Sequence, residues 1–187
     1  SIDYGIDFYA PQTVFSPDGR RIMIGWMQNW DACGVREDDM KWFGQTSCPR
    51  EIQFVDGKLI QNPIRELSNY HKNTVSYSEV LVSDCISLEK VSGRMIDLEI
   101  EIKPEDEENC YDKFVIQFAK NENFHSDIVF YPKESVLEID RSWSGIRRAV
   151  QHQKKCKVAD NNGSIKLRVI LDRYSVEVFV NDGEQAM

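Results

Sequence analysis

Hydrophobic residues recur at every second position over much of the chain, and this period is typical of β-strands with one buried face. Residues 95–102 read M-I-D-L-E-I-E-I, which places Ile96, Leu98, Ile100 and Ile102 on one face and acidic side chains on the other. A short buried-type run occupies residues 22–27. Further strands are predicted at residues 114–118, 126–131, 136–139, 165–171 and 175–180. The sequence therefore predicts an all-β fold.

Turn-forming residues separate these runs. Pro-Asp-Gly, Asp-Gly, Ser-Gly and Asn-Gly sequences fall between the predicted strands. Many short strands at this spacing are typical of a sandwich, a barrel or a propeller. Residues 62–67 break the pattern, because Pro63 can occupy the first position of a helical turn. Aromatic residues and glycine are frequent before this segment and regular alternation follows it, so we expect a domain boundary there.

The run at residues 175–180 predicts a central strand of the later domain. Val176, Val178 and Val180 share one face and are expected in the core, since β-branched residues favour a pleated, half-buried setting. Glu177 lies on the opposite face, which is therefore either partly wet or supplies a partner for the carboxylate. Asn181-Asp182-Gly183 is a turn sequence, so residues 185–187 should begin the returning strand.

Composition excludes several classes of partner. The 187 residues carry a formal net charge of −8, and the sequence pI is about 5.0. An acidic chain lacks the basic surface that nucleic acids and anionic lipids require, so we expect no nucleic-acid partner and no membrane attachment. Charged residues interrupt every apolar run well short of a membrane-spanning helix.

The five cysteines are widely spaced and form no C-x-x-C pair, and the three histidines are scattered. This pattern indicates reduced thiols in a cytoplasmic protein rather than a disulfide framework. It also gives no metal-ligand spacing, so no metal and no cofactor are expected. The chain begins at Ser1 and ends at Met187 within strand-like patterns, which suggests a piece of a longer protein.

Acidic and aromatic residues are interleaved near the amino terminus. Asp7 and Tyr9 precede Pro11, which we expect to stop sheet pairing. Carboxylates accept hydrogen bonds from sugar hydroxyls and aromatic rings stack on the apolar face of a sugar, so the segment is a candidate sugar site. The alternative is a strand that enters a turn with its acids in solvent.

Two further motifs allow a functional and a structural interpretation. Trp26 ends a strand in G-W-M-Q-N-W, where it is either a stacking platform or a plug in the core. Trp30 lies further along the same loop. Arg50 and Glu51 are adjacent and are either a catalytic pair or, more commonly, part of structural ion pairs.

Together these motifs resemble glycoside hydrolase family 32, the invertases, sucrose-6-phosphate hydrolases and fructan hydrolases. The resemblance starts with D-x-G-x-D-F-Y-A-P-Q at residues 3–12, G-W-M-x-x-W at residues 25–30 and P-R-E at residues 49–51. It continues with L-E-I-D-R-S at residues 137–142 and with the segment from Asp172 to Glu184. It implies the last part of a five-bladed β-propeller at residues 1–67, followed by a β-sandwich at residues 68–187.

The resemblance also implies a reaction, the hydrolysis of fructofuranosides with retention by a carboxylate nucleophile and a carboxylic acid/base. The family's W-x-N-D-P-N-G, Arg-Asp-Pro and Glu-Cys motifs are absent from this sequence. We therefore expect no catalytic residue here and no activity from the chain alone. Asp7, Tyr9, Trp26 and Trp30 are the residues expected to line the site of a fructose-containing saccharide in the complete enzyme.

Two other functions fit the later strands. The sandwich could be a carbohydrate-binding module of the lectin type, or it could be purely structural and support the propeller or a subunit contact. The segment from Asp3 to Glu51 argues against a stand-alone binding module, because such a module has no use for additional propeller strands.

Overall fold

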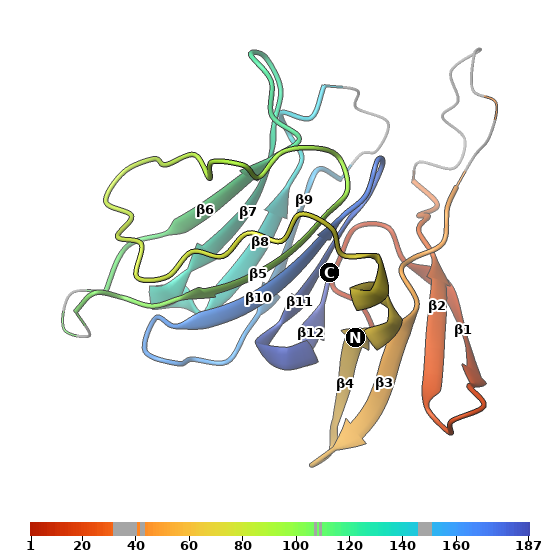
Figure 1. Cartoon of the computed structure of the whole chain (residues 1–187). Helices are drawn as coiled ribbons and strands as arrows, with labels where there is room; N and C mark the ends of the chain where they lie inside the picture. Colours follow the sequence, from red (N-terminus) through yellow and green to blue (C-terminus); the bar gives the residue numbers. More distant parts are fainter. Residues whose placement is uncertain (32–40, 42–43, 107, 109, 146–150) are drawn as a thin grey trace.

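The chain folds into three antiparallel β-sheets (Figure 1). The structure, a computed structural model, describes residues 1–31, 41, 44–106, 108, 110–145 and 151–187. The first sheet, here called the blade, is a meander of four strands in the order β1-β2-β3-β4. Its strands are β1 (Tyr9–Phe15), β2 (Arg21–Trp26), β3 (Arg50–Val55) and β4 (Lys58–Pro63). A 3-10 turn, η1 (Arg65–Tyr70), follows the blade.

The other two sheets form a sandwich. The inner sheet, which faces the blade, has the order β12-β11-β10-β5, and the outer sheet has the order β6-β7-β8-β9. The inner strands are β5 (Ile96–Ile102), β10 (Ile165–Leu171), β11 (Val176–Val180) and β12 (Gln185–Ala186). The outer strands are β6 (Phe114–Phe118), β7 (Ser126–Tyr131), β8 (Val136–Asp140) and β9 (Gln153–Lys157). Two 3-10 turns, η2 (Pro132–Glu134) and η3 (Asn181–Gly183), complete the fold.

The hydrophobic core lies between the inner and outer sheets. Alternate residues of each strand point into it, as the two-residue period predicts. Leu98, Ile100 and Ile102 of β5 take part, which confirms the predicted apolar face for these three, whereas Ile96 is half-buried and outside the core cluster. Within the described residues the helical segments are all short 3-10 turns, and none is long or apolar enough to cross a bilayer.

Three local expectations need correction. Pro11 does not stop pairing, because β1 continues through it with an irregular register between Tyr9 and Gln12. Pro63 ends β4 instead of starting a helix, and the helical turn begins only at Arg65. Both prolines lie in strands at the edge of the sheet, where a missing N–H costs no hydrogen bond to a neighbour. Strand β9 escaped prediction because its sequence, Q-K-K-C-K, offers only one hydrophobic residue.

The predictions for β11 are confirmed. Val178 and Val180 are fully buried in the core, and β11 lies between β10 and β12. The turn after it is η3 rather than a two-residue hairpin loop. Gly183 has φ +102°, and a Cβ atom there would lie 2.5 Å from the backbone oxygen of Gln61 on β4. Glycine is therefore needed where the sandwich approaches the blade.

The blade and the sandwich share a buried ion cluster centred on Arg50 of β3, whose side chain is 1% exposed. Its Nη2 donates to Oε2 of Glu177 on β11 at 2.7 Å, and its Nη1 donates to Oδ2 of Asp3 at 2.8 Å. Gln61 Oε1 also accepts from Nη1, at 3.3 Å. Glu177 therefore has a charged partner on the face of β11 that points away from the core. This agrees with the second of the two interpretations of the sequence, in which that face supplies a partner for the carboxylate.

The same carboxylate also fixes the chain just before β3. Oε1 of Glu177 accepts a hydrogen bond from the backbone N–H of Cys48 at 2.5 Å. Burial raises the pKa of Glu177 above its ordinary value, although Arg50 and the Cys48 N–H oppose the shift. Burial, aided by the charge of Glu177, also raises the pKa of the Cys48 thiol to about 12. Cys48 is therefore a structural thiol and not a nucleophile.

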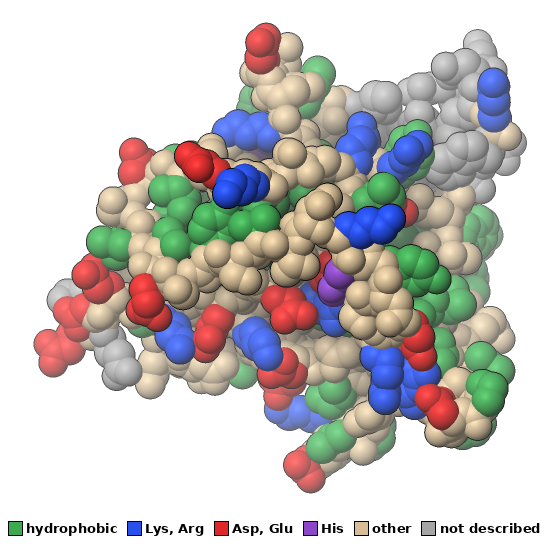
Figure 2. All heavy atoms as spheres, in the orientation of Figure 1, with side chains coloured by type: hydrophobic (Ala, Val, Ile, Leu, Met, Phe, Trp, Pro, Cys, Tyr) green, Lys and Arg blue, Asp and Glu red, His purple; other side chains and the backbone are tan. Residues whose placement is uncertain are grey.

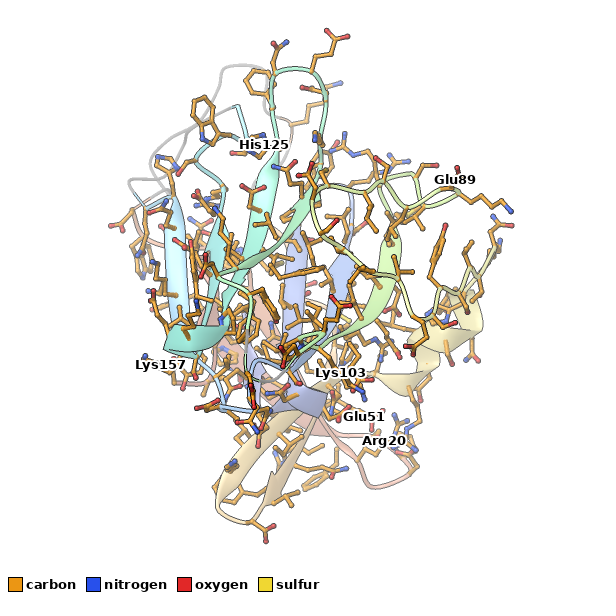
Figure 3. All side chains as sticks on the ribbon, turned by 90° about the vertical axis from the view of Figure 1, so that its left-hand side faces the viewer. Arg20, Glu51, Glu89, Lys103, His125 and Lys157 are labelled. Atoms are coloured by element: carbon orange, nitrogen blue, oxygen red, sulfur yellow. The ribbon has the colours of Figure 1, made fainter. Side chains whose placement is uncertain are left out.

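A second ion network ties the blade to η1. Glu51 accepts hydrogen bonds from Arg65 at 2.8 Å and from Arg20 at 2.7 Å, and Arg20 also pairs with Glu66. The hydrogen bonds from Arg65, followed by those from Arg20, hold the pKa of Glu51 at about 2, below the ordinary 4.5. Figure 3 shows Arg20 and Glu51 together at the blade end of the molecule. Arg50 and Glu51 thus belong to separate structural ion pairs.

We expect Val178→Ala to lower the free energy of unfolding by about 1–3 kcal/mol, because it removes buried methyl groups and leaves a cavity. Chemical denaturation followed by tryptophan fluorescence measures the change. Val75→Ala, at an exposed position outside the core, is the matched control and should leave the midpoint unchanged. An unchanged midpoint for Val178→Ala would contradict its core position.

Replacing one partner of the buried cluster should destabilise the chain strongly. Glu177→Gln leaves the Arg50 guanidinium buried with one charge partner fewer, and removing one member of a buried pair typically costs about 3–5 kcal/mol. Combining Glu177→Leu and Arg50→Met with Asp3→Asn should recover most of that loss, because all three charges of the buried cluster then leave together. A triple variant as unstable as Glu177→Gln would show that the ion pairs themselves, and not the uncompensated charge, determine stability.

The Glu51 network should weaken in acid. A carboxylate whose folded pKa is depressed contributes stability above its unfolded pKa and loses it as the pH falls towards the folded value. The difference in unfolding free energy between the native chain and Glu51→Gln should therefore be largest above pH 4.5 and should vanish near pH 2. Urea titrations of both proteins across this range give the difference directly, and a constant difference would argue against the ion pairs.

Candidate saccharide site

The four residues expected to line a sugar site lie together at one end of the blade. Tyr9 and Trp26 are register partners on β1 and β2. Their ring centroids lie 6.5 Å apart with an interplanar angle of 64°. Trp30, in the loop after β2, places its ring 5.4 Å from Tyr9 at 79°. The structure thus brings three aromatic rings into one edge-to-face cluster, here called the blade aromatic cluster.

The cluster leaves much aromatic surface open to solvent. Tyr9 is 42% exposed, Trp26 is 37% exposed and Trp30 is 64% exposed. Trp26 is therefore a partly open platform and not a plug in the core. Apolar ring surface of this kind can cover the C–H face of a sugar.

The backbone around Trp26 is fixed by a second segment of chain. Thr46 forms a β-bridge with Trp26, and the N–H of Met27 donates to the oxygen of Gln45 at 2.8 Å. Gly44 has φ +78°, and a Cβ atom there would collide with the indole nitrogen of Trp26. The tight packing of residues 44–47 positions the indole before any ligand arrives.

Asp7 joins the blade aromatic cluster to the sandwich. Its Oδ1 accepts a hydrogen bond from the side-chain amide of Asn29, and its Oδ2 accepts from Nη1 of Arg141 at 2.8 Å. Arg141 directly follows β8 of the outer sheet. The guanidinium competes for the lone pairs that a nucleophile would need, so this geometry suits a positioning role for Asp7.

Sequence reasoning missed Asn29 and Arg141 as partners of Asp7, although Arg141 lies within the L-E-I-D-R-S motif. Arg141 lies 134 positions from Asp7, and no local pattern reveals a contact over that distance. The side-chain amide of Asn29 donates to Asp7, and the side chain of Gln28 donates to the Asn29 backbone oxygen at 3.0 Å.

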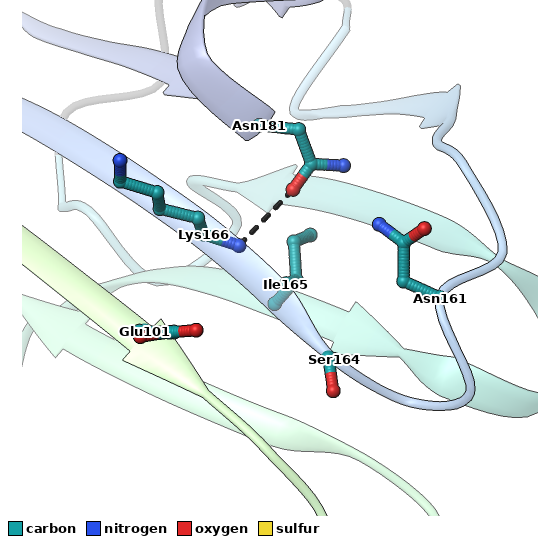
Figure 4. Close-up of a pocket in the computed structure, with 6 residues that line it drawn as sticks. All are labelled: Glu101, Asn161, Ser164, Ile165, Lys166 and Asn181. Atoms are coloured by element: carbon teal, nitrogen blue, oxygen red, sulfur yellow. Dashed lines mark hydrogen bonds between the residues drawn. The ribbon is translucent and has the colours of Figure 1, made fainter.

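One hollow on the described part of the sandwich is too small for a substrate site. Figure 4 shows it, with a volume of about 120 Å³, well below the usual several hundred Å³ of a ligand pocket. Asn181 Oδ1 accepts the Lys166 backbone N–H there at 3.1 Å. Its lining residues are Glu101, Asn161, Ser164, Ile165, Lys166 and Asn181. The described residues also contain no group of three or more His, Cys, Asp or Glu side chains that could hold a metal ion.

Comparison with known proteins assigns both parts of the chain. Residues 1–63 match the profile described as the glycosyl hydrolases family 32 N-terminal domain. Residues 65–187 match the profile described as glycosyl hydrolases family 32 C terminal.

Related proteins carry hydrolase names. Sucrose-6-phosphate hydrolase of Staphylococcus xylosus is 33% identical over 187 residues, which are 100% of this chain and 37% of that protein. Levanase of Bacillus subtilis (strain 168) is 31% identical over 200 residues, which cover 99% of this chain and 29% of that protein. The chain thus spans about a third of the length of the curated relatives it matches.

Solved structures of the same fold include sucrose-6-phosphate hydrolase from Lactobacillus gasseri, which superposes with a TM-score of 0.82 at 23% identity. The match covers 99% of this chain and 36% of that chain. The exo-inulinase from Aspergillus awamori gives a TM-score of 0.75 at 21% identity over 99% of this chain and 38% of that chain. The fold and both profile matches agree with the motifs around Asp7, Trp26 and Arg50. This chain belongs to glycoside hydrolase family 32, a family of enzymes that hydrolyse O-glycosyl bonds.

Proposed function

We propose that this chain is the C-terminal part of a β-fructofuranosidase that hydrolyses sucrose, sucrose 6-phosphate or a fructan with retention. The observation that carries the proposal is the pair of family profiles, which together match residues 1–63 and 65–187 in order. Relatives named sucrose-6-phosphate hydrolase, raffinose invertase and levanase support the substrate class. The catalytic carboxylates would come from the part of the enzyme that precedes these residues.

In this proposal residues 1–67 are the final part of a five-bladed propeller and residues 68–187 are the sandwich. The blade carries exposed apolar side chains on its outer side (Figure 2). They include Val14, Phe15, Ile24, Phe54 and Val55. A free edge strand, β1, and apolar surface of this kind are what a neighbouring blade would cover.

The blade aromatic cluster would form part of the wall of the sugar site. Tyr9, Trp26 and Trp30 would stack on a fructose-containing saccharide and exclude water, while Asp7 would offer its remaining lone pairs to a hydroxyl. Arg141 would hold Asp7 in place from the sandwich. These residues position the substrate and do not break its bond.

The state of the cysteines supports a cytoplasmic location. Cys48, Cys85, Cys110 and Cys156 are all free thiols in the structure. Burial raises the pKa of Cys156 to about 12, with Asp3 adding to the shift, so this thiol is inert. Free thiols of this kind persist in a reducing compartment.

The purified chain should show no saturable hydrolysis of sucrose or inulin, because the covalent step lacks its carboxylate nucleophile. Released reducing sugar is the measurement, with the complete Staphylococcus xylosus enzyme as positive control. Turnover that Asp7→Asn abolishes would contradict the proposal and make Asp7 a catalyst.

A second experiment tests for activity in a fusion protein. In the Staphylococcus xylosus enzyme, the C-terminal third is replaced by this chain. The fusion should hydrolyse sucrose or sucrose 6-phosphate, and Trp30→Ala in it should raise KM more than it lowers kcat. Phe54→Ala, on the same blade but outside the aromatic cluster, is the matched variant. A folded fusion that hydrolyses no fructoside would overturn the proposed function.

A further inference from the structure

A second aromatic platform lies on the sandwich, formed by two loops of the outer sheet. Trp143, in the loop after β8, is 61% exposed. Its ring stacks on His125 with centroids 6.4 Å apart and an interplanar angle of 14°. Phe124 lies beside them and is also exposed. Figure 3 shows His125 at the end of the sandwich far from Glu51.

Hydrogen bonds hold the two loops in one arrangement. The N–H of His125 donates to the oxygen of Trp143 at 3.0 Å. Asn121 Oδ1 accepts from the N–H of Phe124 at 2.8 Å and so closes the loop between β6 and β7. Gly145 has φ +94°, and its Cα lies against the Phe124 ring, where a Cβ atom would come within 3.3 Å. A large apolar ring held rigidly in solvent is typical of a binding surface.

Polar side chains continue the platform across the outward face of the outer sheet, where Gln117 and Gln153 are exposed and Asp127 and Asp140 are half-buried. One row of paired residues crosses all four strands, from Gln117 through Asp127 and Asp140 to Gln153. These residues alternate with core residues along their strands, so they lie on the face away from the core. Amide and carboxylate groups can each engage neighbouring hydroxyls of a sugar.

Within the described residues, one oxygen of this row lacks a partner. Oδ1 of Asp127 is buried without a hydrogen bond, while Oδ2 lies 3.5 Å from Nε2 of His125. A buried carboxylate oxygen is costly to leave unpaired, so Oδ1 requires an internal donor such as a water molecule, whereas Oδ2, beside His125, is the oxygen that a ligand hydroxyl can reach. Asp140 accepts from the N–H of Ser142 at 2.7 Å and from Gln153 at 2.8 Å.

The platform also lies next to the contact between sandwich and blade. Arg141, which pairs with Asp7, is two residues before Trp143 in the same loop. The blade aromatic cluster and the sandwich platform therefore flank one ion pair. The row of paired residues crosses four strands, about 14 Å at the usual strand spacing, which suits a chain of sugars better than a single ring.

We propose that Trp143, His125 and Phe124, with the row that contains Asp127 and Asp140, form a second binding site for a fructose-containing oligosaccharide. Trp143 covers the apolar face of one sugar unit, and Asp127 accepts a hydrogen bond from a hydroxyl of that unit or the next. The substrate class rests on the proposed function. The site itself is noncovalent and separate from the bond-breaking carboxylates.

The test follows the indole N–H resonances of this chain by NMR during titration with inulin-type oligosaccharides. Each resonance is assigned from its loss in a tryptophan-to-phenylalanine variant. We expect the Trp143 resonance to shift saturably. Trp143→Ala should weaken binding at this site, followed through backbone resonances of residues 121–125, by about tenfold, and Asp127→Asn should weaken it about threefold.

A matched variant separates the possible outcomes. Tyr174→Ala removes another exposed aromatic residue and should leave the affinity unchanged. An unchanged spectrum at residues 121–125 and 143 would overturn the sandwich site, yet hydrolysis by the fusion protein would still support the proposed function.

Two further results would also count against the site. An equal response to maltooligosaccharides would overturn the fructose-containing class, and a response to protein concentration alone would identify the platform as a self-association surface. The denaturation midpoint of Trp143→Ala should match that of the native chain, because the ring is exposed. Lost binding together with a lowered midpoint would refute a direct contact between Trp143 and the sugar.

Discussion

A guanidinium that cannot be buried alone determines how this molecule is assembled. Arg50 of β3 is almost completely shielded from water, so its charge must meet carboxylates inside the protein. The structure supplies Glu177 from the sandwich and Asp3 from the segment before the blade. The rings of Phe8 and Phe179 lie 4.6 and 5.2 Å from the guanidinium carbon. Three distant parts of the sequence must therefore be in place before Arg50 is satisfied.

This arrangement links sequence, packing and site geometry. The N–H of Tyr4 donates to the oxygen of Ala186 at 2.8 Å, so the segment that leads from Asp3 towards Asp7 also lies against the last strand. With both of its oxygens engaged, Asp7 then reaches Arg141 across the contact. The position of the blade aromatic cluster relative to the sandwich consequently depends on ion pairs as well as on apolar burial. Because removing these charges from water offsets much of their attraction, the cluster specifies an arrangement more than it adds stability.

Much of the fold could be predicted because the alternation of hydrophobic and polar residues within each strand is a local pattern. The alternation in β5 and β11 reflects one face against the core, and it identified the buried residues Ile102 and Val178 correctly. The prolines of β1 and β4 led to wrong predictions, because a strand accepts proline when it lies at the edge of a sheet and the sequence does not show which strands do. Lysine-rich β9 gave no apolar pattern. At the candidate site the aromatic residues could be predicted from their types, whereas Arg141 could not, since its contact with Asp7 arises only when two domains meet.

Gly183 sets the spacing between blade and sandwich at the η3 end of their contact. Its Cα faces the backbone oxygen of Gln61 so closely that even one methyl group would have to displace β4. Arg50, Gly183 and the Asp7–Arg141 pair are three separate points at which the blade meets the sandwich. A side chain at position 183 would push the two parts away from each other at one of these points. A residue without a side chain therefore limits how closely the whole contact can close.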